Sequence, residues 1–294
     1  MIFLFSLFFY LLIHKPISAQ IPLSHLLLQS YKPSSIYQIK PDLVKKIGNV
    51  LGLTNTITNQ TPLPTPSPLP DLAIGGYQKP ITIAILGDSM IDTLRDFSYL
   101  EKSLKSAYPQ YIFNIINYGL GASNIEYGLF RLENGYQYLD EHHPSLLSQN
   151  PDIIIIESFA YNNFGNTQAG FDKHWLNLGA LTTKIKQSLP QAKILLTSTI
   201  APNSVIFGNG SGTSFSALEK LQNTKTINLY LQNLINFSRS QNFPLADAYT
   251  PSLKNQDGNP IFINQNDGIH PSSVGSQFFQ NILFESLQKY KFVE

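Results

Sequence analysis

The sequence ITIAILGDSM, residues 81–90, begins the regular part of this chain. Its first six residues are nearly all apolar and mostly β-branched, which is typical of a strand buried on both faces of a parallel sheet. Gly87-Asp88-Ser89 comes next, where the pattern predicts a turn from this strand into a helix. A serine at such a turn presents its hydroxyl, and its backbone N–H lies near a helix N-terminus. Taken alone, however, Ser89 is more often expected to be a helix N-cap than a nucleophile.

Further apolar runs alternate with helix-like segments along the rest of the chain. We expect strands at 81–86, 111–117, 152–157, 192–200 and 244–248, and helices at 92–107, 124–139, 170–189, 214–240 and 272–289. This alternation indicates βαβ units. The expected fold class is therefore α/β, a three-layer α/β/α sandwich around a mostly parallel five-stranded sheet. Ligands bind at the carboxyl ends of the strands in such sheets.

The composition excludes several classes of function. The 294-residue chain is 43% hydrophobic and 13% charged, and its formal net charge is +1. This near-neutral balance disfavours nucleic acid as a partner. Cysteine is absent, which excludes disulfide frameworks, cysteine-ligated metals and thiol nucleophiles.

The first 80 residues differ in character from the rest of the chain. The run MIFLFSLFFYLLI (1–13) is short for a membrane span, and small residues come after it up to Ala19. We interpret 1–19 as a signal peptide or an uncleaved membrane anchor, with a buried helix as the less favoured alternative. Either favoured case predicts a protein that is secreted or anchored on the outer side of the cytoplasmic membrane.

Residues 20–80 are interpreted as a proline-rich linker or stalk. The run TPLPTPSPLP (61–70) favours extended polyproline II. The first 80 residues carry six lysines and two aspartates, which suits a stalk near an anionic envelope or simply a solvated linker. The folded domain is expected at 81–294.

A second polar motif, Asp267-Gly268-Ile269-His270-Pro271, precedes the last predicted helix. An aspartate and a histidine three residues apart on a tight turn can hydrogen-bond, and the carboxylate then fixes the tautomer of the imidazole. The alternative is an aspartate that caps the helix beside an exposed histidine. This motif alone does not separate the two interpretations.

Together, the two motifs resemble those of the SGNH, or GDSL-type, hydrolases. Two interior segments support the resemblance: Asn117-Tyr118-Gly119-Leu120-Gly121, after the second strand, and Pro151-Asp152 through Ala160-Tyr161-Asn162-Asn163, on and after the third. The four segments occur in the family's order, and the resemblance covers about residues 81–290. It implies the flavodoxin-like fold of that family and a carboxylic ester hydrolase with no metal or cofactor.

The resemblance implies a role for each matching residue. Ser89 would be the nucleophile, His270 would take and return its proton, and Asp267 would orient His270. The oxyanion hole would be formed by the backbone amides of Ser89 and Gly121 and by the side chain of Asn162. The residue types suit these roles, because glycine lets an N–H approach a ligand closely and an amide side chain donates without adding charge.

Two departures from the family pattern leave alternatives open. The Gly119-x-Gly121 spacing is one residue shorter than usual, so Gly119 could replace Gly121 in the oxyanion hole. In the third segment Ala160 replaces a glycine, and Asn163 replaces an aspartate. Asn162 is the predicted donor, and Asn163 is the alternative.

Other residues are weaker candidates. Phe159, Tyr161, Asn163 and Phe164 surround the predicted donor, and they either line the substrate pocket or pack against the sheet edge. His142-His143 is more readily a solvated loop than a metal site. The loop 208–213 lacks a phosphate-binding motif, and we expect it to be a flexible loop over the site.

The sequence therefore predicts an exported serine ester hydrolase. We expect it to be a monomer that removes short acyl groups from carbohydrate or small esters through an acyl-enzyme. Two alternatives remain: an O-acyltransferase acting on envelope polysaccharide, in which a sugar hydroxyl replaces water, and a non-catalytic binding module that has the same fold.

Overall fold

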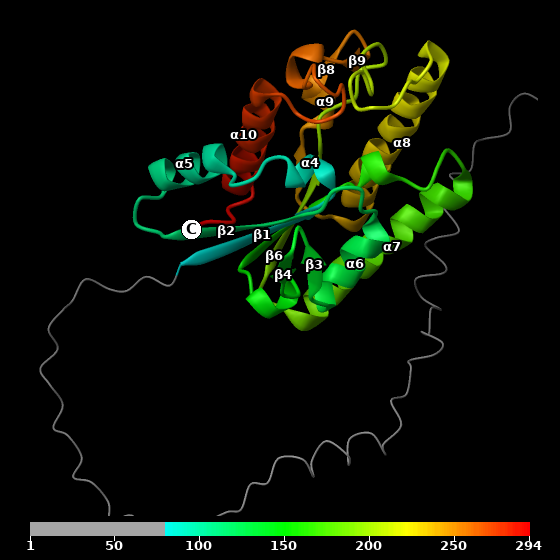
Figure 1. Cartoon of the computed structure of the whole chain (residues 1–294). Helices are drawn as coiled ribbons and strands as arrows, with labels where there is room; N and C mark the ends of the chain where they lie inside the picture. The colour runs from blue at the N-terminus through cyan, green and yellow to red at the C-terminus, as the bar shows by residue number, and fades with distance from the viewer. Residues whose placement is uncertain (1–79) are drawn as a thin grey trace, which may run out of the picture. The chain divides into compact units, whose positions relative to one another are not determined.

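The computed structural model describes residues 80–294 (Figure 1). The predicted signal peptide or anchor, and all of the predicted linker except Pro80, lie outside the described residues. No helix within 80–294 combines the length and the apolar character that are needed to cross a bilayer.

One five-stranded sheet organises the described part of the chain. Its strands are β1 (Ile81–Gly87), β2 (Phe113–Gly119), β5 (Ile153–Glu157), β6 (Lys193–Ser198) and β7 (Leu245–Asp247). They lie in the order β2-β1-β5-β6-β7, and every neighbouring pair is parallel. The expected sheet is thus confirmed, and it is parallel throughout. The order changes direction at β1, so the crevice between β1 and β5 is where a ligand is expected at the carboxyl edge.

Helices cover both faces of the sheet, as Figure 1 shows. On one face lie α5 (Ser98–Ala107) and α10 (Ser273–Lys289), and on the other α6 (Ile125–Glu133), α7 (Gln168–Ser188) and α8 (Ala217–Gln241). Alternate side chains of β1 point to opposite faces of the sheet. Ile83 and Ile85 pack with α5 and α10, whereas Ala84 and Leu86 pack with α6, α7 and α8. This alternation explains the continuous apolar character of the strand, because both of its faces are buried.

The helix predicted at 92–107 is wrong as a single element. It divides into α4 (Ser89–Asp92) and α5, with residues 93–97 between them. Arg95 and Phe97 adopt positive φ, and the Asp96 carboxylate accepts from the Ser98 amide at the start of α5. The apolar spacing misled the prediction because Leu94 and Phe97 are buried even though they lie outside helices.

The helix predicted at 124–139 is too long. It ends at Glu133, and a hairpin of β3 (Tyr136–Tyr138) and β4 (Glu141–His143) replaces its last turn. Asn134 ends the helix in an extended conformation, and Gly135 comes directly after it. His142 and His143 therefore lie in a short strand rather than a loop, and His143 stacks on Tyr136 with ring centroids 5.0 Å apart.

Short elements complete the described part of the chain, and all but the first of them follow the carboxyl ends of β5 or β7. They are η1 (Leu147–Gln149), η2 (Ala160–Asn162), α9 (Tyr249–Ser252), β8 (Leu253–Lys254), β9 (Asp257–Gly258) and η3 (Pro260–Phe262). Of these, η2 matters most for the site, because it comes directly after β5 and carries Asn162.

A buried histidine joins α7 and α8 to the end of β5. His174 is 1% exposed, and its Nε2 lies 2.7 Å from the Ser158 carbonyl oxygen. Since a carbonyl oxygen only accepts, Nε2 carries the proton, and Nδ1 accepts from the Asn233 side chain at 3.0 Å. Burial lowers the pKa of His174 to about 4, although the hydrogen bond to Ser158 acts in the opposite direction. The ring is therefore neutral at physiological pH.

We predict that His174→Gln flattens the acid dependence of stability. The pKa of His174 falls from its ordinary 6.5 to about 4 in the folded chain, so only the unfolded chain binds the proton between these values. The wild-type free energy of unfolding should therefore fall as the pH drops through this window, by at most about 1.4 kcal/mol per pH unit from this group. Urea unfolding across the window measures the difference in slope, and parallel curves would contradict the prediction.

Candidate functional site

The candidate nucleophile Ser89 is held by the turn that joins β1 to α4. Asp88 is the N-cap of α4, and its Oδ1 accepts from the Met90 amide at 2.9 Å. Ser89 is the first residue of that helix, so its own N–H has no acceptor within the helix and can face a ligand. The interpretation of Ser89 as a helix N-cap is therefore wrong, because the capping residue is Asp88.

The second motif forms a tight turn in which Asp267 meets His270. Their side chains join through His270 Nδ1 and Asp267 Oδ2, 3.0 Å apart. The other carboxylate oxygen accepts from the Ile269 and His270 amides at 2.8 and 3.0 Å. Burial opposes ionisation of Asp267, but these hydrogen bonds outweigh it and lower its pKa. The carboxylate is therefore ionised at neutral pH, and it requires His270 Nδ1 to carry a hydrogen.

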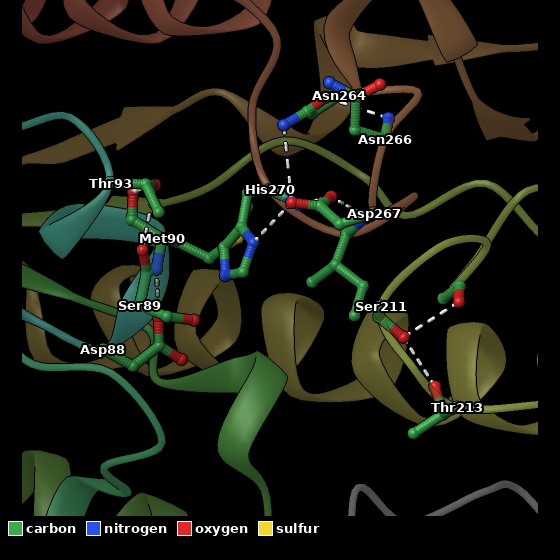
Figure 2. Close-up of polar contacts among 12 residues, drawn as sticks. Asp88, Ser89, Met90, Thr93, Ser211, Thr213, Asn264, Asn266, Asp267 and His270 are labelled. Atoms are coloured by element: carbon green, nitrogen blue, oxygen red, sulfur yellow. Dashed lines mark hydrogen bonds and ion pairs between the residues drawn. The ribbon is translucent and has the colours of Figure 1, made fainter.

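The fold brings this pair to Ser89, 178 positions or more away in the sequence. In Figure 2 the His270 ring lies between Asp267 and Ser89, with its Nδ1 edge toward the carboxylate and its other edge toward Ser89. No hydrogen bond joins the Ser89 hydroxyl to His270 in the described structure. Such a contact often tightens only when a substrate is bound. Both members of the Asp267–His270 pair are about one quarter exposed, so a ligand can reach them.

Asn162 and Asn163 have different surroundings. The Asn162 side chain donates to Asp88 Oδ2 at 3.0 Å, which places it beside the turn that carries Ser89. That amide group has a second hydrogen, which remains available for a ligand. The Asn163 side chain instead donates to the Ala160 carbonyl and accepts from the Gly165 amide, at 2.8 and 2.9 Å. Asn163 thus stabilises the turn after β5, and the geometry favours Asn162 as the donor.

The two candidate glycines also differ. The Gly119 amide donates to Asn117 Oδ1 at 2.7 Å, so it is already occupied. An added Cβ at Gly119 would lie 2.2 Å from the Asp92 backbone nitrogen, which explains why this position needs glycine. At Gly121 an added Cβ would meet nothing closer than 3.4 Å. Gly121 is therefore the better candidate for an amide that approaches a ligand.

Of the residues around Asn162, one is buried in the core and the others are partly exposed. Phe159 is 1% exposed and packs against Gly128 of α6, which favours the packing alternative for this residue. The Tyr161 hydroxyl donates to the Ile200 carbonyl at 3.1 Å. Phe164 lies under the Lys173 ammonium, 4.3 Å from its ring centroid. Tyr161 and Phe164 are partly exposed, as Asn163 is.

Comparison with known proteins identifies the fold. No family model and no curated protein matches the sequence. Solved structures do match: an acetyl xylan esterase at 20% identity, over 70% of this chain and 100% of its own, has a TM-score of 0.51. The lipase/acylhydrolase from Enterococcus faecalis, also at 20% identity, covers 71% and 96% with a TM-score of 0.50. A gut microbial diltiazem-metabolizing enzyme, at 15% identity, covers 72% and 48% with a TM-score of 0.53.

The chain has the SGNH hydrolase fold. At these identities the likeness concerns the fold. In the SGNH fold of this chain, the four segments that carry the sequence resemblance lie at the ends of β1, β2 and β5 and before α10.

Beneath the nucleophile turn, the SGNH fold of this chain buries two carboxyl groups that sequence analysis missed as a pair. Asp88 and Glu157 are both fully buried. One Glu157 oxygen accepts from the Phe159 amide at 2.8 Å and from the Asp88 amide at 3.4 Å. Burial raises the pKa of Glu157 well above its ordinary value, and the neighbouring Asp88 raises it further. The Glu157 carboxyl therefore holds a proton more readily than Asp88, whose pKa burial raises but hydrogen bonds from Met90 and Asn162 lower.

A buried arginine supports the same strand ends. Arg131 of α6 donates to the carbonyls of Gly87 and Tyr118, at the carboxyl ends of β1 and β2, and to the Ser123 hydroxyl. Its positive charge also lowers the pKa of Asp88. Arg131 lies on the buried face of α6, which is otherwise apolar. An arginine at such a position could have signalled a buried charge, but the sequence prediction did not include it. Arg131 thus joins the carboxyl ends of β1 and β2, and Ser89 and Gly121 each lie two residues beyond one of these ends.

The loop at 208–213, expected over the site, packs against the Asp267 turn. An added Cβ at Gly268 would lie 1.9 Å from the Ile206 carbonyl oxygen, and one at Gly210 would lie 2.1 Å from that of Asn266. Both glycines have positive φ. Within residues 80–294, no group of three or more histidine, aspartate or glutamate side chains is arranged to hold a metal.

We predict that alanine destabilises the fold at Gly119 but not at Gly121. Gly119→Ala forces a Cβ against the backbone of α4, which cannot move without shifting the nucleophile turn. The free energy of unfolding should fall by about 1–3 kcal/mol. Gly121→Ala should change it by less than about 0.5 kcal/mol, because the Cβ has room. Urea unfolding measures both, and equal losses would contradict the assignment.

Proposed function

We propose that this chain is an exported serine ester hydrolase that removes short acyl groups from carbohydrate or small esters. The observation that carries the proposal is the Asp267–His270 pair presented to Ser89 at the carboxyl edge of the sheet. Asn162 beside the same turn supports it further, since it supplies a donor next to the nucleophile. The acyl-hydrolase and esterase names of the compared structures agree with this chemistry.

In the proposed acylation step, the Ser89 oxygen attacks the ester carbonyl carbon. Its proton passes to Nε2 of His270, and the Asp267 carboxylate stabilises the imidazolium through Nδ1. The tetrahedral intermediate collapses when the C–O bond to the alcohol breaks. His270 returns the proton to the departing alkoxide, which leaves an acyl-serine and a neutral imidazole.

Deacylation repeats these steps with water. His270 takes a proton from water, the resulting hydroxide attacks the acyl carbon, and Ser89 leaves with the proton that His270 returns. The products are one carboxylic acid, one alcohol and the regenerated serine. In both steps the negative charge on the former carbonyl oxygen is stabilised by the amides of Ser89 and Gly121 and by Asn162.

The proposed location rests on the apolar run at 1–13 and the small residues up to Ala19. Export would bring the site to esters outside the cytoplasm. A proline-rich spacer would then separate the folded domain from the membrane, if residues 1–19 stay uncleaved. Ester-linked acyl groups on polysaccharide are substrates of the kind that such a location supplies.

We predict that Ser89→Ala and His270→Ala each abolish ester turnover. The substitutions remove the nucleophile and its base but touch no core contact, so kcat should fall by at least about 10³-fold without a change in fold. Release of p-nitrophenol from p-nitrophenyl acetate measures the rate for the full chain. Circular dichroism and thermal unfolding provide the control for folding. Turnover that persists in either folded variant would refute the proposed function.

We also predict that the two asparagines respond differently to alanine. Asn162→Ala removes a donor to the developing oxyanion and should lower kcat by about 10²–10³-fold. Asn163→Ala serves as the matched control, because its side chain bonds only to the turn around Ala160 and Gly165. It should lower thermal stability while leaving kcat within about threefold. The reverse pattern would assign the donor to Asn163.

A further inference from the structure

Four hydrogen bonds close a ring that contains the candidate oxyanion donor. Glu157 Oε2 accepts from the Asp88 amide at 3.4 Å, and Asp88 Oδ2 accepts from the Asn162 side chain at 3.0 Å. The Asn162 amide donates to the Phe159 carbonyl at 3.2 Å, and the Phe159 amide donates to Glu157 Oε2 at 2.8 Å. The ring thus joins the end of β1, which leads into Ser89, to the turn after β5 that carries Asn162.

The sheet itself determines where Glu157 lies. Glu157 is the last residue of β5, and it is fully buried. An added Cβ at Gly87 would lie 2.8 Å from Glu157 Cβ, so the end of β1 approaches this side chain closely. A carboxyl group buried at such a place requires hydrogen-bond partners inside the protein, and the ring supplies them.

The chain turns back at Phe159, and the Glu157 side chain stabilises that turn. Phe159 has a φ of 53°, a left-handed conformation that is unfavourable for a residue with a bulky side chain. Such a conformation persists only where its surroundings hold it. Here the Glu157 carboxyl group binds the Phe159 amide, and the Phe159 ring is buried in the core. Because η2 follows directly, the conformation of Phe159 decides where Asn162 lies.

The other carboxyl oxygen of Glu157 is bonded to the same turn. Glu157 Oε1 accepts from the Ser158 hydroxyl, whose oxygen accepts in turn from the Ala160 amide at 3.3 Å. Within the described residues, the three hydrogen bonds of the Glu157 side chain therefore all end in the segments that carry Ser89 and Asn162.

We propose that Glu157 is a positioning residue of this site: its carboxyl group orients Asn162 toward the oxyanion by holding the turn after β5 against the turn that carries Ser89. Glu157 itself touches no substrate atom. The inference rests on the proposed function, in which Asn162 donates to the oxyanion. Such a donor must lie within about 2.7–3.1 Å of the charged oxygen, so a shift of about 1 Å removes its effect.

The proposed role requires an acceptor at Glu157 rather than a charge. Oε2 accepts from both backbone amides of the ring, and a proton on Oε1 would leave Oε2 able to accept. Glutamine has nearly the same shape and one acceptor oxygen, and the Ser158 hydroxyl can accept from its NH2 group. Glu157→Gln should therefore preserve the ring, whereas leucine, which offers no acceptor, should open it.

The test compares the full-length wild type with Glu157→Leu, Glu157→Gln and Asp152→Ala. In Glu157→Leu, kcat for p-nitrophenyl acetate should fall by about 10²–10³-fold, the loss expected for one oxyanion donor. KM should change by less than about threefold, because the donor acts on the transition state. Glu157→Gln should keep kcat within about fivefold of wild type, the size of one weakened hydrogen bond.

Asp152 provides the matched control, because it is a second carboxylate that links β5 to β1. It directly precedes β5 and accepts from the Thr82 amide at 2.8 Å, at the opposite end of the strand from Glu157. Asp152→Ala should lower thermal stability but keep kcat within about threefold of wild type, because it displaces no donor to the oxyanion. Thermal unfolding establishes that each variant is folded.

A double variant separates positioning from general damage. If Glu157 acts through Asn162, the Glu157→Leu/Asn162→Ala protein should be no more than about threefold slower than Asn162→Ala alone. Losses that multiply would show that Glu157 acts elsewhere, and they would overturn the inference. A Glu157→Gln protein as slow as Glu157→Leu would overturn it too, since the ring needs only an acceptor.

A readout that needs no activity separates this inference from the proposed function. Exchange of the Asn162 Nδ2 hydrogens with water, measured by NMR, should become at least about 10-fold faster in Glu157→Leu, although Asp88 is intact, and stay unchanged in Asp152→Ala. Unchanged exchange in Glu157→Leu overturns the inference even in an active enzyme. Absence of wild-type turnover, together with faster exchange in the variant, refutes the esterase instead. If Glu157→Leu fails to fold, Glu157→Asp, which draws the carboxyl group back by one methylene, replaces it in every measurement.

Discussion

The site depends on the buried carboxylate of Asp88, which joins three elements at one point. Its oxygens accept from the Met90 amide at the start of α4 and from the Asn162 side chain after β5, while its own backbone continues β1. Burial of a charge is unfavourable unless hydrogen bonds replace its water, and these two donors do so. Because one carboxylate caps the nucleophile helix and holds the candidate oxyanion donor, the two groups keep a fixed separation.

Two neighbouring ionisable groups, Glu157 and Arg131, affect the charge of Asp88. Glu157 lies beside it, and two ionised carboxylates in one dry region would repel strongly. Burial and the charge of Asp88 both raise the pKa of Glu157, and burial raises the pKa of Asp88 as well, so the two groups disfavour each other's ionisation. Arg131 adds a buried positive charge nearby while it binds the ends of β1 and β2. The turn that carries Ser89 thus lies over two buried carboxyl groups and one buried arginine.

The sequence predicted those features that depend on local pattern. The five strands, the turn at Ser89 and the Asp267–His270 turn are each contained within a few consecutive residues, so spacing and residue type suffice to find them. The break in the helix predicted at 92–107 escaped detection, because Leu94 and Phe97 keep a helical apolar spacing while the backbone does not. The roles of Glu157 and Arg131 escaped for another reason: each acts on a segment more than 40 residues away.

Tyr138 illustrates the limit of motif-based reasoning about function. It lies where a helix was predicted, and a helical residue at that position would have no reason to meet Asp92. Only the end of α6 at Glu133 allows the hairpin to turn back toward α4. The groups proposed to perform chemistry come from segments that follow β1, β2 and β5 or precede α10, whereas Tyr138 comes from a hairpin outside the five-stranded sheet.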